Sequence, residues 1–518
     1  MASKLLPQRE LHFVLVPFMA QGHLLPMTDI AKLLAQHGVV VTIITTPVNA
    51  GRIRGTVSRA VESTGVQITV AELELPSDDG VGLLPKHCET LDQLPSLGQG
   101  AALLYSVQAL EKPMEKLFEE LRPRPNCVIS DVCLPFTSTV ARKFGVPRIT
   151  FNGFSAFTLL CLRNIHQGAD LLESEKGVLA TLSSDSERFV VPGLPDRVEV
   201  TMNQLPIAMA GGLDRLGERV VEAEGYSYGM IVNSFEELEQ EYFSRYKAAM
   251  GGKAWSVGPV SSCNKDRLDR FERGNPGSTI NESECLKWLD SQECGSVIYV
   301  CMGSLCNIPT PQLIELGLGL EAWTGPFVWV VREGETSKGL LKWMEDYSFE
   351  EKTKGRGLIV RGWAPQMVIL SHPAVDGFLT HCGWNSTLEG ICAGLPMVTW
   401  PLFGDQFLNE RLVVDVLKIG VPIGAEATLK WGEEEKTRVL IEREDVRQAI
   451  EELMGGGDEK EMRRKRAKEF SEKSKLVLEE GGSSYLNIEL LIQDIMQHTS
   501  KKCEEAMLSR KNGEILVS

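Results

Sequence analysis

The sequence lacks the features of membrane-spanning, zinc-binding and nucleic-acid-binding proteins. No apolar run reaches the ~18 residues needed to cross a bilayer. The 12 cysteines are spread singly along the chain, with no C-x-x-C pair and no Cys/His spacing typical of zinc. Basic residues are outnumbered, with 54 Lys and Arg against 70 Asp and Glu. The resulting net charge of −16 repels phosphate backbones and anionic lipids, so we expect no nucleic-acid partner and no membrane span.

The sequence also gives little sign of export. Sparse, unpaired cysteine is typical of a reducing compartment. Lys4 and Arg9 precede an apolar stretch at residues 11–20, as in a signal peptide, but Pro17 interrupts it and no A-x-A-like site follows. A buried first strand is the better interpretation, and we expect a cytoplasmic protein.

Strand and helix patterns alternate through the N-terminal half of the chain. Residues 12–17 form an apolar run typical of a strand buried on both faces, and residues 24–36 have helical spacing. Residues 39–46 are rich in β-branched side chains, as in a strand. The further elements expected are strands at residues 66–73, 127–130 and 148–151, and helices at residues 101–121 and 137–144. This alternation predicts a parallel sheet covered by helices on both faces.

The pattern stops at a polar stretch and then restarts. Residues 261–284 have no apolar period, and new strand–helix units begin at residues 296–301. We therefore expect an α/β protein with two Rossmann-like domains whose parallel sheets face each other across a cleft. The expected division is an N-terminal domain at residues 1–255, a linker at 256–284, a C-terminal domain at 285–480, a C-terminal helix at 481–497 and a disordered tail at 498–518.

One glycine motif points toward a dinucleotide but lies in the wrong place. Residues 317–322 match G-x-G-x-x-G/A, a fingerprint that must form the turn directly after a strand. Here the motif lies inside a helix predicted from residue 312. We therefore expect these glycines to serve close helix packing, and an NAD-dependent oxidoreductase is disfavoured.

The segment at residues 363–406 carries polar residues at the ends of predicted strands. His381, Asn385 and Ser386 follow a strand at residues 375–380, and a helix begins close behind them. Unpaired N–H groups and the dipole at a helix N-terminus favour an anion, so this turn predicts a phosphate site. An N-cap role for Asn385 or Ser386 is the structural alternative.

Three further residues of this segment suit a ligand that carries hydroxyl groups and a flat base. Asp405 and Gln406 follow a strand predicted at residues 396–400, and a carboxylate beside an amide suits a ligand rich in hydroxyl groups. Helix capping by Asp405 is the alternative. Trp363 follows a strand predicted at residues 358–360 and either offers a flat face to a base or packs in the core.

This segment closely resembles the signature box of plant family-1 UDP-glycosyltransferases. It starts with WAPQ at residue 363, contains HCGWNSTLEG from residue 381, and ends with DQ at residue 406. FMAQGHLLPM near the start and ISDVCLP in the middle are also similar, so the resemblance covers nearly the whole chain. It is closest to the subgroup that glucosylates flavonoids, triterpenoids, steroids and related small molecules. The resemblance implies the GT-B fold, in which two Rossmann-like domains face across a cleft. It also implies that the domain at residues 1–255 binds the acceptor, that the domain at residues 285–480 binds the UDP-sugar, and that the helix at 481–497 packs back on the N-terminal domain.

The resemblance assigns each donor-site residue a part of the UDP-sugar. The residues are Trp363, Ala364 and Gln366 at uracil, Glu389 at the ribose hydroxyls, His381, Asn385 and Ser386 at the phosphates, Ser304 at the phosphate or sugar, and Trp384, Asp405 and Gln406 at the sugar. Gln at the last position of the box implies glucose. Gly404 stands where many relatives carry Ala, which weakens that inference.

Two residues of the N-terminal half are candidates for acid–base chemistry. His23 lies in the turn expected after the first strand, and Asp131 directly follows the strand at residues 127–130. Each has a structural alternative, a capping or core role for His23 and a helix cap for Asp131. The resemblance implies that His23 is a general base for an acceptor hydroxyl and that Asp131 orients it. Inversion at the anomeric carbon would then give a β-O-glucoside.

Several functions stay open from the sequence. The donor could carry galactose, rhamnose, xylose or glucuronic acid, and the acceptor could be a phytohormone. A non-catalytic protein that binds a UDP-sugar or an aglycone, and a nucleotide-sugar epimerase, are the other classes. We expect UDP-glucose as co-substrate, a small lipophilic acceptor from plant secondary metabolism, no cofactor, no metal and a monomer.

Overall fold

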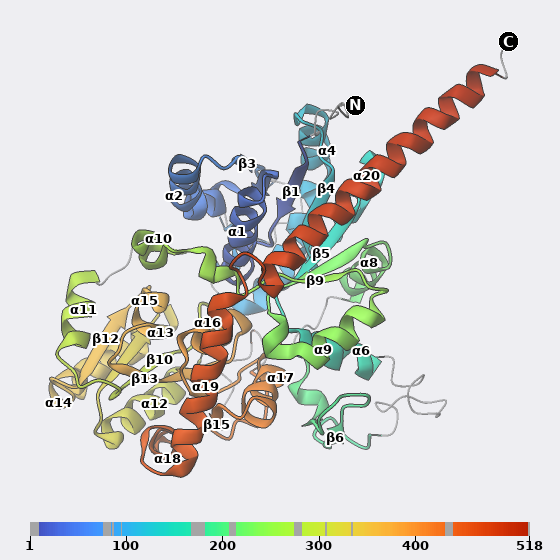
Figure 1. The fold of residues 1–518 in the computed structure, drawn as a ribbon. Helices are drawn as coiled ribbons and strands as arrows, with labels where there is room; N and C mark the ends of the chain where they lie inside the picture. Colours follow the sequence, from blue (N-terminus) through green and yellow to red (C-terminus); the bar gives the residue numbers. More distant parts are fainter. Residues whose placement is uncertain are drawn as a thin grey trace.

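The chain folds around two parallel β-sheets (Figure 1). This computed structural model describes residues 10–75, 84, 88–94, 96–166, 182–206, 214–273, 282–305, 308–332, 335–429, 432 and 439–515. The α/β fold with two parallel sheets, predicted from the sequence, is confirmed. A short antiparallel pair, β6 (Phe189–Val190) and β7 (Glu199–Val200), lies outside both sheets.

The first sheet has the strand order β3-β2-β1-β4-β5-β8-β9. Its strands are β1 (His12–Val16), β2 (Val40–Thr45), β3 (Ile68–Glu72), β4 (Cys127–Asp131), β5 (Arg148–Asn152), β8 (Gly229–Val232) and β9 (Ala254–Ser256). The helices that follow are α1 (Gln21–Gln36), α2 (Pro47–Thr64), α3 (Gly100–Ser106), α4 (Glu111–Glu120), α5 (Phe136–Phe144), α6 (Ala156–His166), α8 (Asp214–Gly225) and α9 (Glu236–Ala249). β1 pairs with both β2 and β4, so Leu15 lies between Ile43 and Ile129.

Strand β1 is buried on both faces, as its apolar run predicted. Phe13 and Leu15 belong to the core shared with α1 and α2, whereas Val14 and Val16 belong to the core on the opposite face. This division follows from the two-residue period of a strand. Since β1 is central, its carboxyl end opens onto the middle of the molecule, where the loop to α1 begins.

The second sheet has the order β12-β11-β10-β13-β14-β15. Its strands are β10 (Val297–Cys301), β11 (Phe327–Val331), β12 (Gly357–Arg361), β13 (Val375–Thr380), β14 (Met397–Thr399) and β15 (Gly420–Pro422). Its helices are α12 (Thr310–Trp323), α13 (Glu335–Asp346), α14 (Phe349–Lys352), α15 (Gln366–Leu370), α16 (Trp384–Ala393), α17 (Gln406–Arg411) and α18 (Arg443–Met454). The glycines of the G-x-G-x-x-G/A match lie within α12, where a Cβ on Gly319 would come 2.6 Å from Val446 of α18. Close helix packing therefore explains Gly319.

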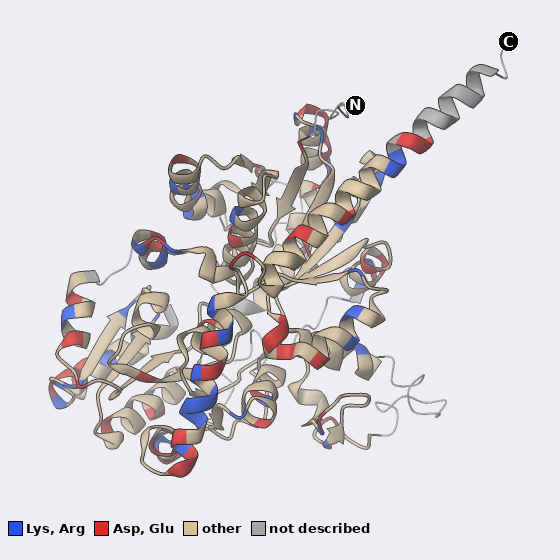
Figure 2. Ribbon diagram, in the orientation of Figure 1, with Lys and Arg blue, Asp and Glu red and all other residues tan. Residues whose placement is uncertain are grey.

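The segment between the sheets contains two short helices, α10 (Arg267–Glu272) and α11 (Glu282–Asp290). After the second sheet, helix α19 (Asp458–Leu476) leads to α20 (Ser483–Ile515), which returns to the first sheet (Figure 1). Ile488, Leu491 and Ile495 are buried in the same core as Phe13. Acidic and basic residues are interspersed along α18 and α19 (Figure 2).

Two sequence expectations differ from the structure. The tail at residues 498–518 was expected to be disordered, but α20 continues to Ile515, and residues 516–518 lie outside the described part. Lys, Glu, Ala, Met and Leu dominate this stretch, and these residues have high helix propensity. The first helix begins at Gln21, so His23 lies on the first helical turn and not in the loop before it.

Candidate functional site

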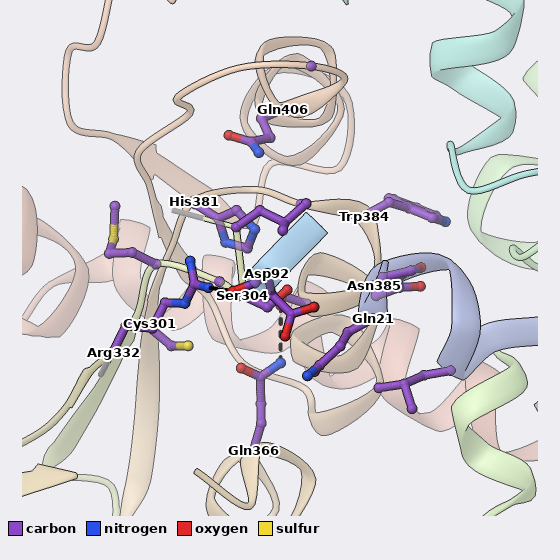
Figure 3. Close-up of a pocket in the computed structure, with 18 of the residues that line it drawn as sticks. Gln21, Asp92, Cys301, Ser304, Arg332, Gln366, His381, Trp384, Asn385 and Gln406 are labelled. Atoms are coloured by element: carbon purple, nitrogen blue, oxygen red, sulfur yellow. Dashed lines mark hydrogen bonds between the residues drawn. The ribbon is translucent and has the colours of Figure 1, made fainter. Parts of the chain in front are cut away.

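A cavity of about 590 Å³ lies between the carboxyl ends of the two sheets (Figure 3). This size is within the range of small-molecule sites. Of the thirteen site residues predicted from the sequence, twelve line this cavity. The thirteenth, Asp131, lies directly behind His23. The sequence-predicted residues on its wall are His23, Ser304, Trp363, Ala364, Gln366, His381, Trp384, Asn385, Ser386, Glu389, Asp405 and Gln406.

His23 and Asp131 form a hydrogen-bonded pair across two neighbouring strand ends. The distance from His23 Nδ1 to Asp131 Oδ2 is 2.6 Å, and the other carboxylate oxygen accepts the backbone N–H of Cys133 at 2.9 Å. Asp131 is fully buried, while the His23 side chain is 26% exposed. Because a carboxylate only accepts hydrogen bonds, it holds the imidazole proton on Nδ1 and leaves Nε2 as an acceptor. Helix α5 has Pro135 at its N-cap position, so Asp131 does not cap it.

The surroundings of His23 favour its protonated form. Burial alone would lower the pKa of His23, but the negative charge of Asp131, its hydrogen bond and the charge of Asp405 together raise this pKa above 6.5. The edge of Phe18 packs against the imidazole, with ring centroids 5.5 Å apart. The ring is therefore fixed in direction and has a strengthened affinity for a proton.

The N-terminus of α16 opens onto the same cavity. Gly383, which has no side chain, is the N-cap residue, so neither Asn385 nor Ser386 plays the capping role considered as an alternative. Residues 383–386 all line the cavity. A helix start without a capping side chain leaves backbone N–H groups free to bind an anion. The geometry therefore suits the phosphate groups of a ligand.

The side chains of the first turn of α16 hold the two halves of the molecule together. The amide of Asn385 donates to the carbonyl of Gly22 at 2.6 Å and accepts from Asn233 at 3.3 Å. The indole N–H of Trp384 donates to the carbonyl of Asn233 at 2.6 Å. Figure 3 shows the Trp384 indole pointing away from His381 and Gln406, so its backbone is the part that faces the cavity.

His381 is wedged between two glycines. A Cβ on Gly303 or on Gly383 would come 2.4 Å from His381 Nε2, and Gly303 has a φ of +80°. Burial lowers the pKa of His381 to about 4, so the ring is neutral near pH 7. Its Nδ1 is buried without a partner among the described residues. A neutral imidazole with an unused nitrogen can donate one hydrogen bond to a phosphate oxygen without adding a charge.

A second network surrounds Glu389, one turn further along α16. Gln366 donates to the Glu389 carboxylate at 2.8 Å and to the hydroxyl of Ser386 at 3.1 Å. Arg273, from the segment between the sheets, donates to the other carboxylate oxygen of Glu389. The Glu389 carboxylate is thus held from both sides at the cavity wall. Trp363 and Ala364, which follow β12, lie on the same wall.

Asp405 and Gln406 lie at the start of α17. Asp405 occupies the N-cap position, but its side chain does not cap the helix and instead accepts from Asn409 at 2.6 Å. Burial raises the pKa of Asp405 to about 6. The amide oxygen of Gln406 accepts the backbone N–H groups of Leu402 and Phe403 at 2.8 and 3.0 Å. This leaves the amide nitrogen of Gln406 as the group available to a ligand (Figure 3).

Sequence reasoning missed several residues of this wall. Arg273 and Arg332 came from segments with no motif, and Gln21 was overlooked although it lies two residues before His23. The Oε1 atom of Gln21 is buried without a partner among the described residues. Asn233 does not line the cavity, but it bonds to Trp384 and Asn385, which do; it follows β8 directly, so its place at a strand end was a signal that could have identified it.

Part of the wall near His23 is apolar. The apolar residues there are Phe18, Leu91, Leu104, Phe154 and Pro206. Among the residues that the structure describes, no three His, Cys, Asp or Glu side chains lie together as metal ligands would. None of the helices in the described part is both long and apolar enough to cross a bilayer.

Known proteins match the chain along nearly its full length. A family model described as "UDP-glucoronosyl and UDP-glucosyl transferase" matches residues 281–459. UDP-glycosyltransferase 1 of Barbarea vulgaris is 54% identical over 489 residues, which are 94% of this chain and 97% of the relative. UDP-glycosyltransferase 73C5 of Arabidopsis thaliana is 51% identical over 500 residues, which are 96% and 99% of the two chains.

A solved structure shows the same architecture. The crystal structure of UGT73P12 of Glycyrrhiza uralensis, complexed with glycyrrhetinic acid 3-O-monoglucuronide, aligns with a TM-score of 0.86. It is 37% identical in sequence, and the alignment covers 98% of this chain and 99% of that chain.

Proposed function

The chain belongs to the plant UDP-glycosyltransferase family, and we propose that it transfers glucose from UDP-glucose to a hydroxyl group of a small lipophilic plant metabolite. Its two parallel sheets have the GT-B architecture expected from the sequence. The observation that carries the proposal is one cavity that contains both the His23–Asp131 pair on the first domain and, on the second, a helix N-terminus whose cap residue is a glycine.

The base in this proposal is His23. Its Nδ1 is engaged by Asp131, so Nε2 accepts the proton of the acceptor hydroxyl as that oxygen attacks the anomeric carbon. Asp131 fixes the tautomer and stabilises the imidazolium that forms, which is the logic of a catalytic triad. General-base assistance of this kind contributes about 10²–10⁴-fold in rate. A single displacement of this kind turns an α-linked donor into a β-O-glucoside.

The leaving UDP is stabilised by the second domain. The N–H groups that open α16 meet the negative charge that develops on the diphosphate, and they are in place before the reaction starts. His381 adds a neutral hydrogen-bond donor, and the hydroxyls of Ser304 and Ser386 lie on the same wall. In this assignment Trp363 stacks on uracil beside Ala364, while Glu389 accepts the ribose hydroxyls.

The sugar lies between the two domains in this proposal. Asp405 and the amide nitrogen of Gln406 bind its hydroxyl groups, together with the backbone at Trp384. Gln406 favours glucose, and galactose, rhamnose, xylose or glucuronic acid are the alternative sugars. Because burial raises the pKa of Asp405 to about 6, this carboxyl changes charge near neutral pH and contributes to the pH dependence of sugar binding.

The acceptor occupies the apolar part of the wall. Phe18, Leu91 and Phe154 offer a lipophilic surface within reach of His23. The structural relative complexed with glycyrrhetinic acid 3-O-monoglucuronide supports a triterpenoid among the candidate acceptors. Flavonoid, steroid and phytohormone hydroxyls are the other candidates, because apolar pockets discriminate weakly between similar ligands.

A panel assay tests this function. The protein is incubated with UDP-glucose and representative flavonoids, triterpenoids and steroids, and the products are identified by mass. A glucoside that disappears in His23→Ala, while calorimetry shows unchanged UDP binding, supports the proposal. UDP binding without any glucoside would favour a non-catalytic binding protein. Activity of His23→Ala within a few-fold of wild type would refute the base role.

A further inference from the structure

Arg273 reaches the donor wall from the segment that joins the two domains. It follows helix α10 and belongs to the lining of the cavity. Its side chain is 13% exposed and ion-paired with two carboxylates, Glu389 of α16 and Asp29 of α1. The bond to Asp29 Oδ2 is 2.7 Å long. An arginine between two buried carboxylates is a costly arrangement unless its geometry is well satisfied.

The contact with Glu389 fixes the direction of that carboxylate. Arg273 donates to Oε1, and Gln366 donates to Oε2 at 2.8 Å. With one donor on each oxygen, the carboxylate plane cannot rotate without losing a hydrogen bond to a charged or amide group. Each oxygen keeps a second lone pair, which is the capacity needed to accept two adjacent hydroxyl groups.

The contact with Asp29 anchors the arginine from the other side. Asp29 lies on α1, the helix that carries His23 on its first turn, and it also accepts from Asn264 at 2.8 Å. Lys32, one turn further along α1, donates to Asn264 and Asp269, each at 2.8 Å. The segment that carries Arg273 is therefore tied to the first domain by buried polar contacts.

One donor of Arg273 is still unused. Its Nε is buried and has no acceptor among the described residues. A buried N–H without a partner is unfavourable, so an arriving oxygen atom that accepts from it improves binding. This observation is independent of the two ion pairs and also points to a ligand with oxygen atoms at this wall.

We propose that Arg273 is a positioning residue of the ribose subsite. It holds the Glu389 carboxylate in the orientation that accepts hydrogen bonds from the two ribose hydroxyls of the donor. This inference rests on the proposed function, because it assigns the ligand of the same cavity. It adds to the nucleotide site a residue that lies outside the signature segment at residues 363–406. Donor affinity thereby depends on the inter-domain segment as well as on the second domain.

Steady-state kinetics of Arg273→Gln test the proposal, with UDP-glucose and its 2′-deoxy-ribose analogue as donors. Loss of a hydrogen bond to a charged group predicts a KM for UDP-glucose raised about 10–100-fold, with kcat changed less than about three-fold. With the deoxy analogue the same substitution should raise KM less, because one of the two hydroxyls that would donate to Glu389 is missing. Equal effects on both donors would overturn the ribose assignment.

Two further variants separate positioning from loss of structure. Arg59→Gln is the matched control, because Arg59 pairs with Asp269 and Glu272 of α10 but does not contact Glu389. Its KM for the donor should stay within two-fold of wild type. An increase equal to that of Arg273→Gln would show that a loosened α10 explains the effect and would overturn the proposal. Arg273→Lys, which keeps the charge, should restore part of the affinity, and no restoration would count against it.

A double-mutant cycle links the effect to Glu389. If Arg273 acts through this carboxylate, Arg273→Gln should add less than about two-fold to KM in a Glu389→Gln background. Fully additive effects would overturn the inference. Calorimetry with UDP on the wild-type protein distinguishes the two levels of the argument. Absence of UDP binding would refute the proposed function, whereas equal UDP binding by wild type and Arg273→Gln would refute this inference alone.

Discussion

Asp131→Asn removes one negative charge from a position that water does not reach, and it leaves the side-chain shape almost unchanged. The carboxylate is fully buried and lies 2.6 Å from His23 Nδ1. An asparagine amide can donate to Nδ1, which would move the imidazole proton to Nε2. His23 Nε2, which in the proposed mechanism takes the proton of the acceptor hydroxyl, would then carry a proton itself.

The size of the effect follows from the charge that is lost. At an effective dielectric constant of about 20, two unit charges about 4 Å apart attract by about 4 kcal/mol. Only part of this energy is felt in the transition state, where the imidazolium is partly formed. We therefore expect kcat to fall about 10²–10⁴-fold, or about 3–5 kcal/mol, which is the usual range of general-base assistance.

The pH profile supplies a second readout of Asp131→Asn. In the wild type the raised pKa of His23 places the acid limb of kcat/KM above pH 6.5, because the protonated ring cannot act as a base. In the variant the charge and hydrogen bond of Asp131 are absent, so only Asp405 opposes the lowering of this pKa by burial, and the acid limb should move to lower pH. Initial rates from pH 5 to 9 measure both changes.

A rate within a few-fold of wild type, with an unmoved acid limb, would refute the role of this pair. UDP binding by calorimetry is the control for correct folding. It should be nearly unchanged, because Asp131 does not line the cavity in which the nucleotide is placed.

Three other changes test the proposed donor site and the packing around it. Trp363→Ala should weaken UDP binding about 5–150-fold in calorimetry, because base–aromatic stacking is worth about 1–3 kcal/mol, and unchanged affinity would contradict the stacking. Gly303→Ala would place a Cβ 2.4 Å from His381, at a φ of +80° that disfavours alanine, so donor KM should rise sharply; a wild-type KM would contradict this packing. Burial raises the pKa of Glu410 from 4.5 to about 7. Protonated Glu410 therefore contributes at most about 3 kcal/mol to the free energy of unfolding below pH 4.5, and this contribution is lost as the pH rises through 7. Melting curves of Glu410→Gln should therefore depend less on pH in that window than those of wild type, and equal slopes would count against the buried acid.

The sequence predicted the sheets and the places of the site residues because both follow from short-range patterns. Asp131 and His381 each lie at or just beyond the carboxyl end of a parallel strand, and strand ends meet at one edge. Alternating βα units therefore located most of the cavity wall. The family resemblance added which part of a UDP-sugar each residue would meet, and these roles stay predictions.

The sequence could not predict the directions of individual side chains. Asn385 and Trp384 were expected on the phosphate and the sugar, yet their side chains bond to Gly22 and Asn233 of the other domain. Those partners lie more than 150 residues away in the chain, and no local pattern encodes such a contact. Arg273 was hidden for the same reason, because one arginine in a polar stretch carries no signal of its own.

The return of α20 to the first sheet has a consequence for biosynthesis. The core that contains Phe13 of β1 is completed by Ile488, Leu491 and Ile495 of α20. The first strand to leave the ribosome can therefore be fully packed only after α20 has been synthesised. Until that helix arrives, an apolar strip on the nascent first domain is uncovered, as in other intermediates prone to aggregation. Translation must therefore be almost finished before the core of the first domain can be completed.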